Sequence, residues 1–336
     1  MNIPFWVWAV TLGVTLTFLL VDIAVIARRP HVPSMGEAGR HLAFFVGCAI
    51  AFGIGVWIFA GQRYGAEFFA GWLTEYSLSI DNLFVFLIIM AKFGVPEKLQ
   101  QSALMVGIVI ALVLRAIFIA VGAALINQFA WVFYLFGAFL IYTAIKLAKE
   151  AREDGHEEEF EENALLKWVE QRFPAVQTWE YGTKLFAHVG GKRVLTPMFI
   201  VILALGTTDL LFALDSIPAI YGLTQEPFLV LTANIFALMG LRQLYFLIGG
   251  LLKRLIYLGL GLSVLLAFIG VKLILHAMHE NTLPFINGGE HITWAPEIPI
   301  GVSLGAIVTI LGVTTVASLM ASRRTAKAAS SERHPQ

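Results

Sequence analysis

Residues 197–222 read PMFIVILALGTTDLLFALDSIPAIYG, an apolar stretch that carries two acids, Asp209 and Asp215. About 20 mostly apolar residues suffice for a helix to cross a bilayer, so this stretch predicts a membrane span with carboxylates inside it. A second apolar stretch, 68–91, carries Glu75 and Asp81 at the same spacing of six residues. An acid at membrane depth costs roughly 2.5–3.5 kcal/mol on insertion scales. Two matching pairs therefore indicate a transporter with a carboxylate-lined path.

The composition of the whole chain agrees with a membrane protein. Of 336 residues, 58% are hydrophobic and 14% are charged, whereas a soluble domain carries about 25% charged residues. The net charge is zero and no strongly basic tract is present, which argues against nucleic-acid binding. The lone cysteine, Cys48, excludes an internal disulfide or a thiolate metal cluster within one chain. We expect no enzymatic activity and no permanently bound cofactor.

Hydropathy predicts an all-α polytopic membrane protein with about nine transmembrane helices. The first stretch is not expected to be a signal peptide, because it lacks a basic leading region, is too long, and is followed by Arg28 and Arg29. The nine stretches lie near 4–27, 41–60, 68–91, 103–126, 129–148, 197–222, 226–248, 255–276 and 297–320.

The positions of Lys and Arg predict the orientation, because cytoplasmic loops are enriched in both. Nineteen of the 23 basic residues lie in or beside loops that follow odd-numbered spans, and one lies in a loop after an even-numbered span. We expect a plasma or inner membrane protein with its N-terminus outside and its tail, 321–336, in the cytoplasm. The acidic loop 149–196 is then cytoplasmic. It is expected to be a solvated linker with a short amphipathic helix around 165–173, or alternatively a regulatory cation sensor.

The chain contains an internal repeat of three spans, 68–148 and 197–276. Glu75 and Asp81-Asn82 in the first unit correspond to Asp209 and Asp215-Ser216 in the second. Arg115 in the first unit corresponds to Arg242 in the second. Because each unit has an odd number of spans and both follow cytoplasmic loops, the two units are expected to be inverted. Inverted repeats are common in secondary transporters, with the substrate site near the midplane.

The side chains of the two motifs are oxygen donors. Carboxylates, carboxamides and hydroxyls suit hard divalent ions such as Mg²⁺, Ca²⁺ or Mn²⁺, and Asp81-Asn82 and Asp215-Ser216 supply them. Pro218 removes a backbone hydrogen bond from its helix, which predicts either a hinge or a packing kink. Asn234 is expected to face the path or to bond a neighbouring helix.

Arg115 and Arg242 require partners, because an unpaired charge in hydrocarbon is too costly. The simplest interpretation is that they form salt bridges with the acids, either as purely structural pairs or as counter-ions that yield to a cation. Acids that release a cation can take up protons instead, which would make the protein an antiporter. The alternatives are a non-transporting membrane scaffold or assembly factor for metal or tellurite stress complexes, and, less favoured, an intramembrane aspartyl protease.

At these motifs the sequence resembles the TerC/Alx family of integral membrane proteins, named for tellurite resistance. The likeness covers about residues 5–320 and rests on EYSLSIDN at 75–82, DLLFALDSIPAI at 209–220 and LRQLYF at 241–246. The resemblance implies a lysine-exporter-like architecture of two inverted three-helix units and manganese efflux. It assigns the metal path to Glu75, Asp81, Asn82, Asp209, Asp215 and Ser216.

This sequence departs from some members of that family at Gly206, where they carry an additional acid. The departure leaves the preferred metal open. Tellurite resistance need not mean tellurium transport, since an anion fits poorly beside four carboxylates. The expected partners are the lipid bilayer, a divalent metal ion, most of all manganese, protons as coupling ion, and a second copy in a homo-oligomer.

Overall fold

The computed structural model describes residues 3–28, 34–129, 131–151, 164–176, 178–189, 191–248, 257–281, 283, 286–292 and 294–332. Within these ranges the description does not extend to the side chains of 22–28, 81, 84, 127, 164–165, 170, 248, 289 and 323–332. The acidic run 157–162 lies outside the described residues, and so does the side chain of Asp81.

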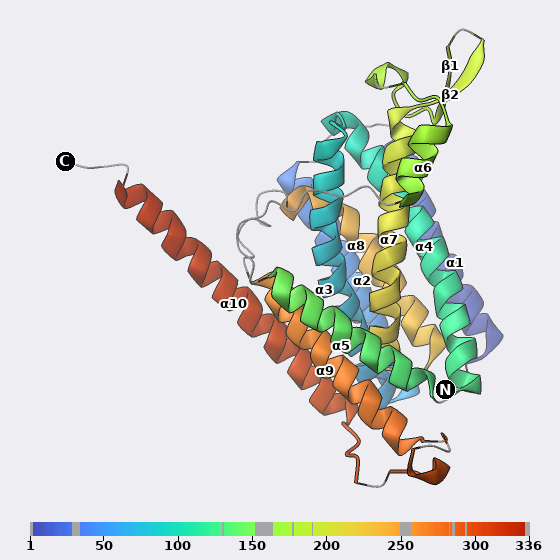
Figure 1. Cartoon of the computed structure of the whole chain (residues 1–336), viewed down its shortest axis with the longest axis vertical. Helices are drawn as coiled ribbons and strands as arrows, with labels where there is room; N and C mark the ends of the chain where they lie inside the picture. Colours follow the sequence, from blue (N-terminus) through green and yellow to red (C-terminus); the bar gives the residue numbers. More distant parts are fainter. Residues whose placement is uncertain are drawn as a thin grey trace.

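In the part of the chain that the structure describes, nine long helices form the body of the molecule (Figure 1). They are α1 (Phe5–Arg28), α2 (Met35–Ala60), α3 (Gln62–Lys92), α4 (Glu97–Gln128), α5 (Val132–Glu150), α7 (Pro197–Tyr221), α8 (Pro227–Ile248), α9 (Leu258–His279) and α10 (Ile300–Glu332). All except α1 have a described stretch long and apolar enough to cross a membrane, eight in total, and Phe5–Val21 of α1 is a shorter apolar helix. The prediction of an all-α polytopic membrane protein is confirmed.

Local sequence signals explain where several helices begin and end. Ser34 caps α2 by accepting a hydrogen bond from the Glu37 amide, and Thr196 caps α7 in the same way, with Pro197 in its first turn. Only Gly61 separates α2 from α3. Its φ of 107° is open to glycine and unfavourable for other residues, so this residue permits the tight reversal between the two helices.

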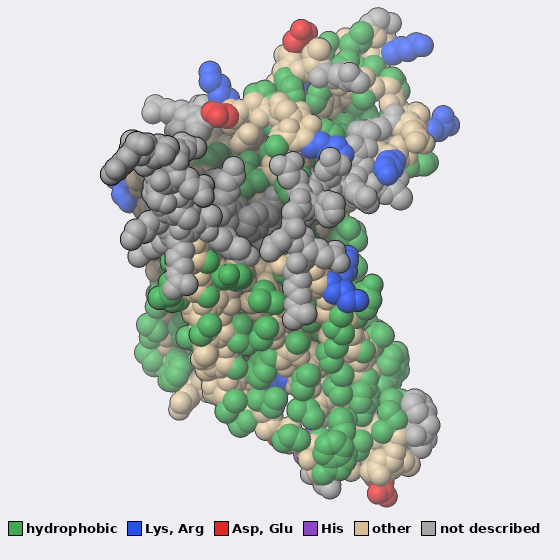
Figure 2. All heavy atoms as spheres, turned by 60° about the vertical axis from the view of Figure 1, so that its left-hand side comes forward, with side chains coloured by type: hydrophobic (Ala, Val, Ile, Leu, Met, Phe, Trp, Pro, Cys, Tyr) green, Lys and Arg blue, Asp and Glu red, His purple; other side chains and the backbone are tan. Residues whose placement is uncertain are grey.

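The outer surface of the bundle is apolar. Figure 2 shows hydrophobic side chains over most of the lower body, with most of the visible Lys and Arg at the upper end. Helix α10 illustrates the pattern, because Val302, Val308, Val313 and Met320 are all more than half exposed. A contiguous apolar surface of this kind is unfavourable in water and fits contact with lipid.

The helices of the two predicted repeat units pack in matching pairs. Helix α3 packs against α8, α4 packs against α7, and α5 packs along α9 (Figure 1). This pairing is what two intertwined three-helix units related by a two-fold axis give. That the units are inverted repeats stays a prediction.

The segment between α5 and α7 contains more structure than a linker. It forms α6 (Ala164–Arg172), the 3-10 turn η1 (Trp179–Tyr181) and an antiparallel hairpin of β1 (Phe186–Val189) and β2 (Lys192–Leu195). Figure 1 shows the hairpin beyond the upper end of the bundle. Helix α6 lies at the predicted amphipathic stretch, whereas sequence reasoning missed the hairpin. A second 3-10 turn, η3 (Asn287–Gly289), precedes α10.

Candidate functional site

A single buried arginine joins two acids in the middle of the bundle. Arg115 of α4 is only 1% exposed and forms ion pairs with Glu75 of α3 and with Asp209 of α7. The contact with Asp209 is bidentate: Nη2 lies 3.1 Å from Oδ1, and Nε lies 3.3 Å from Oδ2. Paired N–H groups of this kind match carboxylate geometry, which a lysine cannot reproduce.

Two neutral residues complete the surroundings of the guanidinium. Arg115 Nη1 donates to the side-chain oxygen of Asn234, on α8, at 3.1 Å and to the hydroxyl of Ser216, on α7, at 3.4 Å. The amide nitrogen of Asn234 donates to the Val230 carbonyl at 3.0 Å, which leaves its oxygen facing Arg115. The site is therefore built from α3, α4, α7 and α8.

Helical spacing decides which predicted residues of α7 reach this site. Asp209 and Ser216 are seven residues apart and lie within about 20° of each other around the helix axis, so both face Arg115. Asp215 is rotated by about 100° from Ser216. It is half-buried and accepts a hydrogen bond from the Thr143 hydroxyl, on α5, at 3.0 Å. The two acids of the second motif thus have different surroundings.

The described side chains around Arg115 carry more negative than positive charge. Glu75 and Asp209 are both buried, and one guanidinium faces them. The second oxygen of Glu75, Oε2, is buried with no hydrogen-bond partner among the described residues. The hydroxyls of Thr74 and Ser79, on the same helix, are also buried and also lack a partner there. A buried carboxylate oxygen without a donor requires an explanation such as a water, a proton or an ion.

Comparison with known families fits this arrangement of acids within membrane helices. Residues 60–326 match the integral membrane protein TerC family. The chain belongs to the TerC family. Its sequence relatives are also described as membrane proteins. The chain is 46% identical over 317 residues to an uncharacterized membrane protein of Mycobacterium tuberculosis (strain ATCC 25618 / H37Rv), which covers 94% of this chain and 80% of that protein.

Two further relatives are more distant. An uncharacterized membrane protein of Myxococcus xanthus is 37% identical, over 94% of this chain and 92% of its own length. The putative membrane-bound redox modulator Alx of Escherichia coli (strain K12) is 35% identical, over 92% of each chain. No solved structure matches the chain.

Two other predicted site residues of this TerC protein are also buried in the bundle. Asn82 is buried on α3 and Arg242 is buried on α8. Pro218 lies in the last turn of α7, and the helix continues through it to Tyr221. Among the described residues, no three His, Cys, Asp or Glu side chains gather closely enough to hold a metal ion. The side chain of Asp81, which the sequence assigns to the same path, is not part of that set.

Two polar residues were not assigned from the sequence: Thr143, which contacts Asp215, and Glu67, which lies apart from the Arg115 site and contacts Thr224. Thr143 was not considered, and its only signal was a hydroxyl within the apolar stretch of α5. Glu67 was also missed, because it lies at the edge of the predicted span 68–91 and outside both motifs. Asn234 was considered, and here it contacts the buried arginine.

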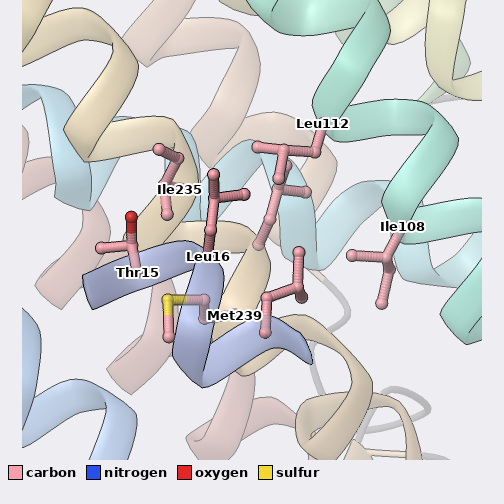
Figure 3. A pocket seen from close by; sticks show the side chains of 8 residues that line it. Thr15, Leu16, Ile108, Leu112, Ile235 and Met239 are labelled. Carbon is pink, nitrogen blue, oxygen red and sulfur yellow. The ribbon is translucent and has the colours of Figure 1, made fainter. Parts of the chain in front are cut away.

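A small pocket between α1, α4 and α8 offers no second site for an ion (Figure 3). Its volume of about 10 Å³ is at the lower limit for one water molecule. The lining side chains are aliphatic apart from Met239 and Thr15, and the Thr15 hydroxyl already donates to carbonyls of its own helix. The acids of the TerC site do not line it.

Proposed function

We propose that this TerC-family protein exports a hard divalent cation, most of all manganese, through the site formed by Glu75, Asp209 and Arg115. The observation that carries the proposal is a pair of fully buried carboxylates that share one arginine where four membrane helices meet. Ionisable groups within membrane helices are costly and are associated with ion pathways and proton relays. A buried carboxylate oxygen without a donor supports the same interpretation.

Arg115 acts in this proposal as an internal counter-ion. It neutralises the acids while no cation is bound and must withdraw, at least from one acid, when the metal enters. The groups it would release are two carboxylates, a hydroxyl and an amide oxygen, which are the ligands that Mn²⁺ and Mg²⁺ prefer. Asp81, Asn82 and Asp215 are proposed to supply further oxygens along the path.

Proton exchange follows from the same charges. When the cation leaves, a buried carboxylate without a positive partner is unfavourable, and binding a proton removes its charge. The inward proton gradient would then drive cation export. We further propose that the two three-helix units are inverted and that the N-terminus faces outward. The pairing of α3 with α8 and of α4 with α7 supports the first point, and the distribution of Lys and Arg supports the second.

One observation favours a second candidate, a non-transporting scaffold. Arg115 already has two carboxylates and two neutral acceptors, which is also the composition of a structural ion pair that fixes four helices together. A redox role, which the name of the Escherichia coli relative suggests, could not use an internal dithiol, because the chain has one cysteine.

Flux measurements with purified protein in liposomes separate these candidates. We expect Mn²⁺ influx, followed with an enclosed metal-sensitive dye under an imposed proton gradient, to fall at least tenfold in Glu75→Gln and in Asp209→Asn. Glu150→Gln is the matched control, since Glu150 is exposed and pairs with Lys146 along its own helix. No flux of any divalent ion through the wild type under either gradient direction would rule out transport and leave the scaffold.

A further inference from the structure

A polar cavity lies at one end of the bundle, apart from the Arg115 site. It has a volume of about 730 Å³ and is bounded by the first turn of α3, the ends of α7 and α9, and the starts of α8 and α10. Charged groups line it, among them Arg63, Glu67, Lys272 and Glu297. The rim is open to solvent, because the side chains of Arg63 and Glu297 are 78% and 63% exposed.

Glu67 is the buried carboxylate of this cavity. It is 5% exposed, and its two oxygens have different partners. Oε1 accepts from Arg63 Nε at 2.8 Å, and Oε2 accepts from the Thr224 hydroxyl at 2.7 Å. The Lys272 ammonium, from α9, also interacts electrostatically with it. The positive charges facing Glu67 belong to two long side chains, Arg63 and Lys272, and that of Arg63 is 78% exposed.

The position of Glu67 relates it to the central site. It lies on α3 eight residues before Glu75, about 12 Å along the helix and about 80° around it. The two carboxylates therefore occupy the same side of α3, one in the middle of the bundle and one in the cavity wall. The Lys and Arg distribution puts this end of α3 at the extracytoplasmic surface.

We propose that Glu67 is a second cation-binding carboxylate, which receives the divalent ion from the Glu75 and Asp209 site and releases it through the outer cavity. The proposal rests on the proposed transport function. Arg63 acts as the counter-ion of Glu67, as Arg115 does in the central site. Its guanidinium pairs with the carboxylate until a cation displaces it. Because Arg63 is mostly exposed, it can leave Glu67 at little cost and keep its own hydration.

The test measures the Mn²⁺ concentration that gives half-maximal transport and compares it between the wild type and variants reconstituted in liposomes. Mn²⁺ is added at the outer face of the protein. We expect Glu67→Gln to raise the half-maximal concentration at least tenfold, and Glu290→Gln, an exposed acid that does not line the cavity, to change it less than twofold. Arg63→Ala should lower it about threefold, because the competing cation is gone. A purely structural Arg63–Glu67 pair cannot explain opposite changes in the two variants.

Each outcome has a distinct meaning. If Glu67→Gln transports like the wild type while Glu75→Gln and Asp209→Asn do not, this inference is wrong and the central site stands. If Glu67→Gln fails to fold, Arg63→Ala decides alone, and an unchanged or raised half-maximal concentration overturns the inference. If the wild type transports no divalent ion, the proposed function is wrong, and the cation-binding role of Glu67 is wrong as well.

Discussion

At the scale of single residues, Arg115 determines the character of the buried site. Its guanidinium is the one charged donor that reaches Glu75 and Asp209 among the described side chains, and Asn234 and Ser216 accept hydrogen bonds from its Nη1. A buried ion pair contributes little net stability compared with apolar residues, but removing one partner leaves an uncompensated charge. The arginine therefore contributes to stability and, in the proposed function, to cation transport.

Replacing Arg115 by leucine should destabilise the protein by about 3–5 kcal/mol, because two buried carboxylates lose their partner. Reversible unfolding in detergent micelles measures the change. The triple variant Arg115→Leu, Glu75→Gln, Asp209→Asn should recover at least half of the loss, since it leaves no buried charge at the site. A single variant as stable as the wild type would show that the ion pairs are not part of the folded core.

At the scale of helices, α5 and α9 pack backbone to backbone at Gly137 and Gly270. A side chain at Gly137 would place its Cβ 2.6 Å from Ile274 Cγ1 and 2.8 Å from the Gly270 carbonyl oxygen, and a Cβ at Gly270 would lie 3.0 Å from the Gly137 carbonyl. Small residues at such contacts let membrane helices approach backbone to backbone. On another side of α5, the Thr143 hydroxyl donates to Asp215 of α7.

Gly137→Ala should therefore cost about 1–3 kcal/mol by overpacking, detected as a lower thermal unfolding temperature in detergent. Gly305→Ala on α10 is the matched control, because a Cβ there meets no atom within 4 Å. It should leave the unfolding temperature unchanged or slightly raised. Equal effects of the two variants would mean that the α5–α9 contact is loose.

At the scale of the whole molecule, the orientation in the membrane can be measured directly. In a Cys48→Ala background, which removes the only thiol, Glu297→Cys and Glu180→Cys place one exposed thiol at each end of the bundle. We expect a membrane-impermeant maleimide to label Glu297→Cys in intact cells and Glu180→Cys only after permeabilisation. The reverse pattern would overturn the positive-inside assignment and the direction of export.

The fold was predictable from the sequence to a greater extent than the site. The predicted spans agree with the long helices, although α3 begins at Gln62 and α4 at Glu97, each about six residues before the apolar stretch. Polar first turns such as Gln62–Glu67 extend a helix beyond its hydrophobic part, and hydropathy does not detect them. For the same reason hydropathy gives no signal for Glu67.

The sequence by itself determined the all-α class and the approximate positions of the long apolar helices, because each helix satisfies its own backbone hydrogen bonds in lipid and needs only enough apolar residues. It also identified the acids and arginines, since a charge in an apolar stretch is visible without a fold. Only the tertiary structure decided that Arg115 holds Glu75 and Asp209 together while Asp215 contacts Thr143. Those partners lie on different helices, and contacts between helices depend on how the surfaces pack in three dimensions.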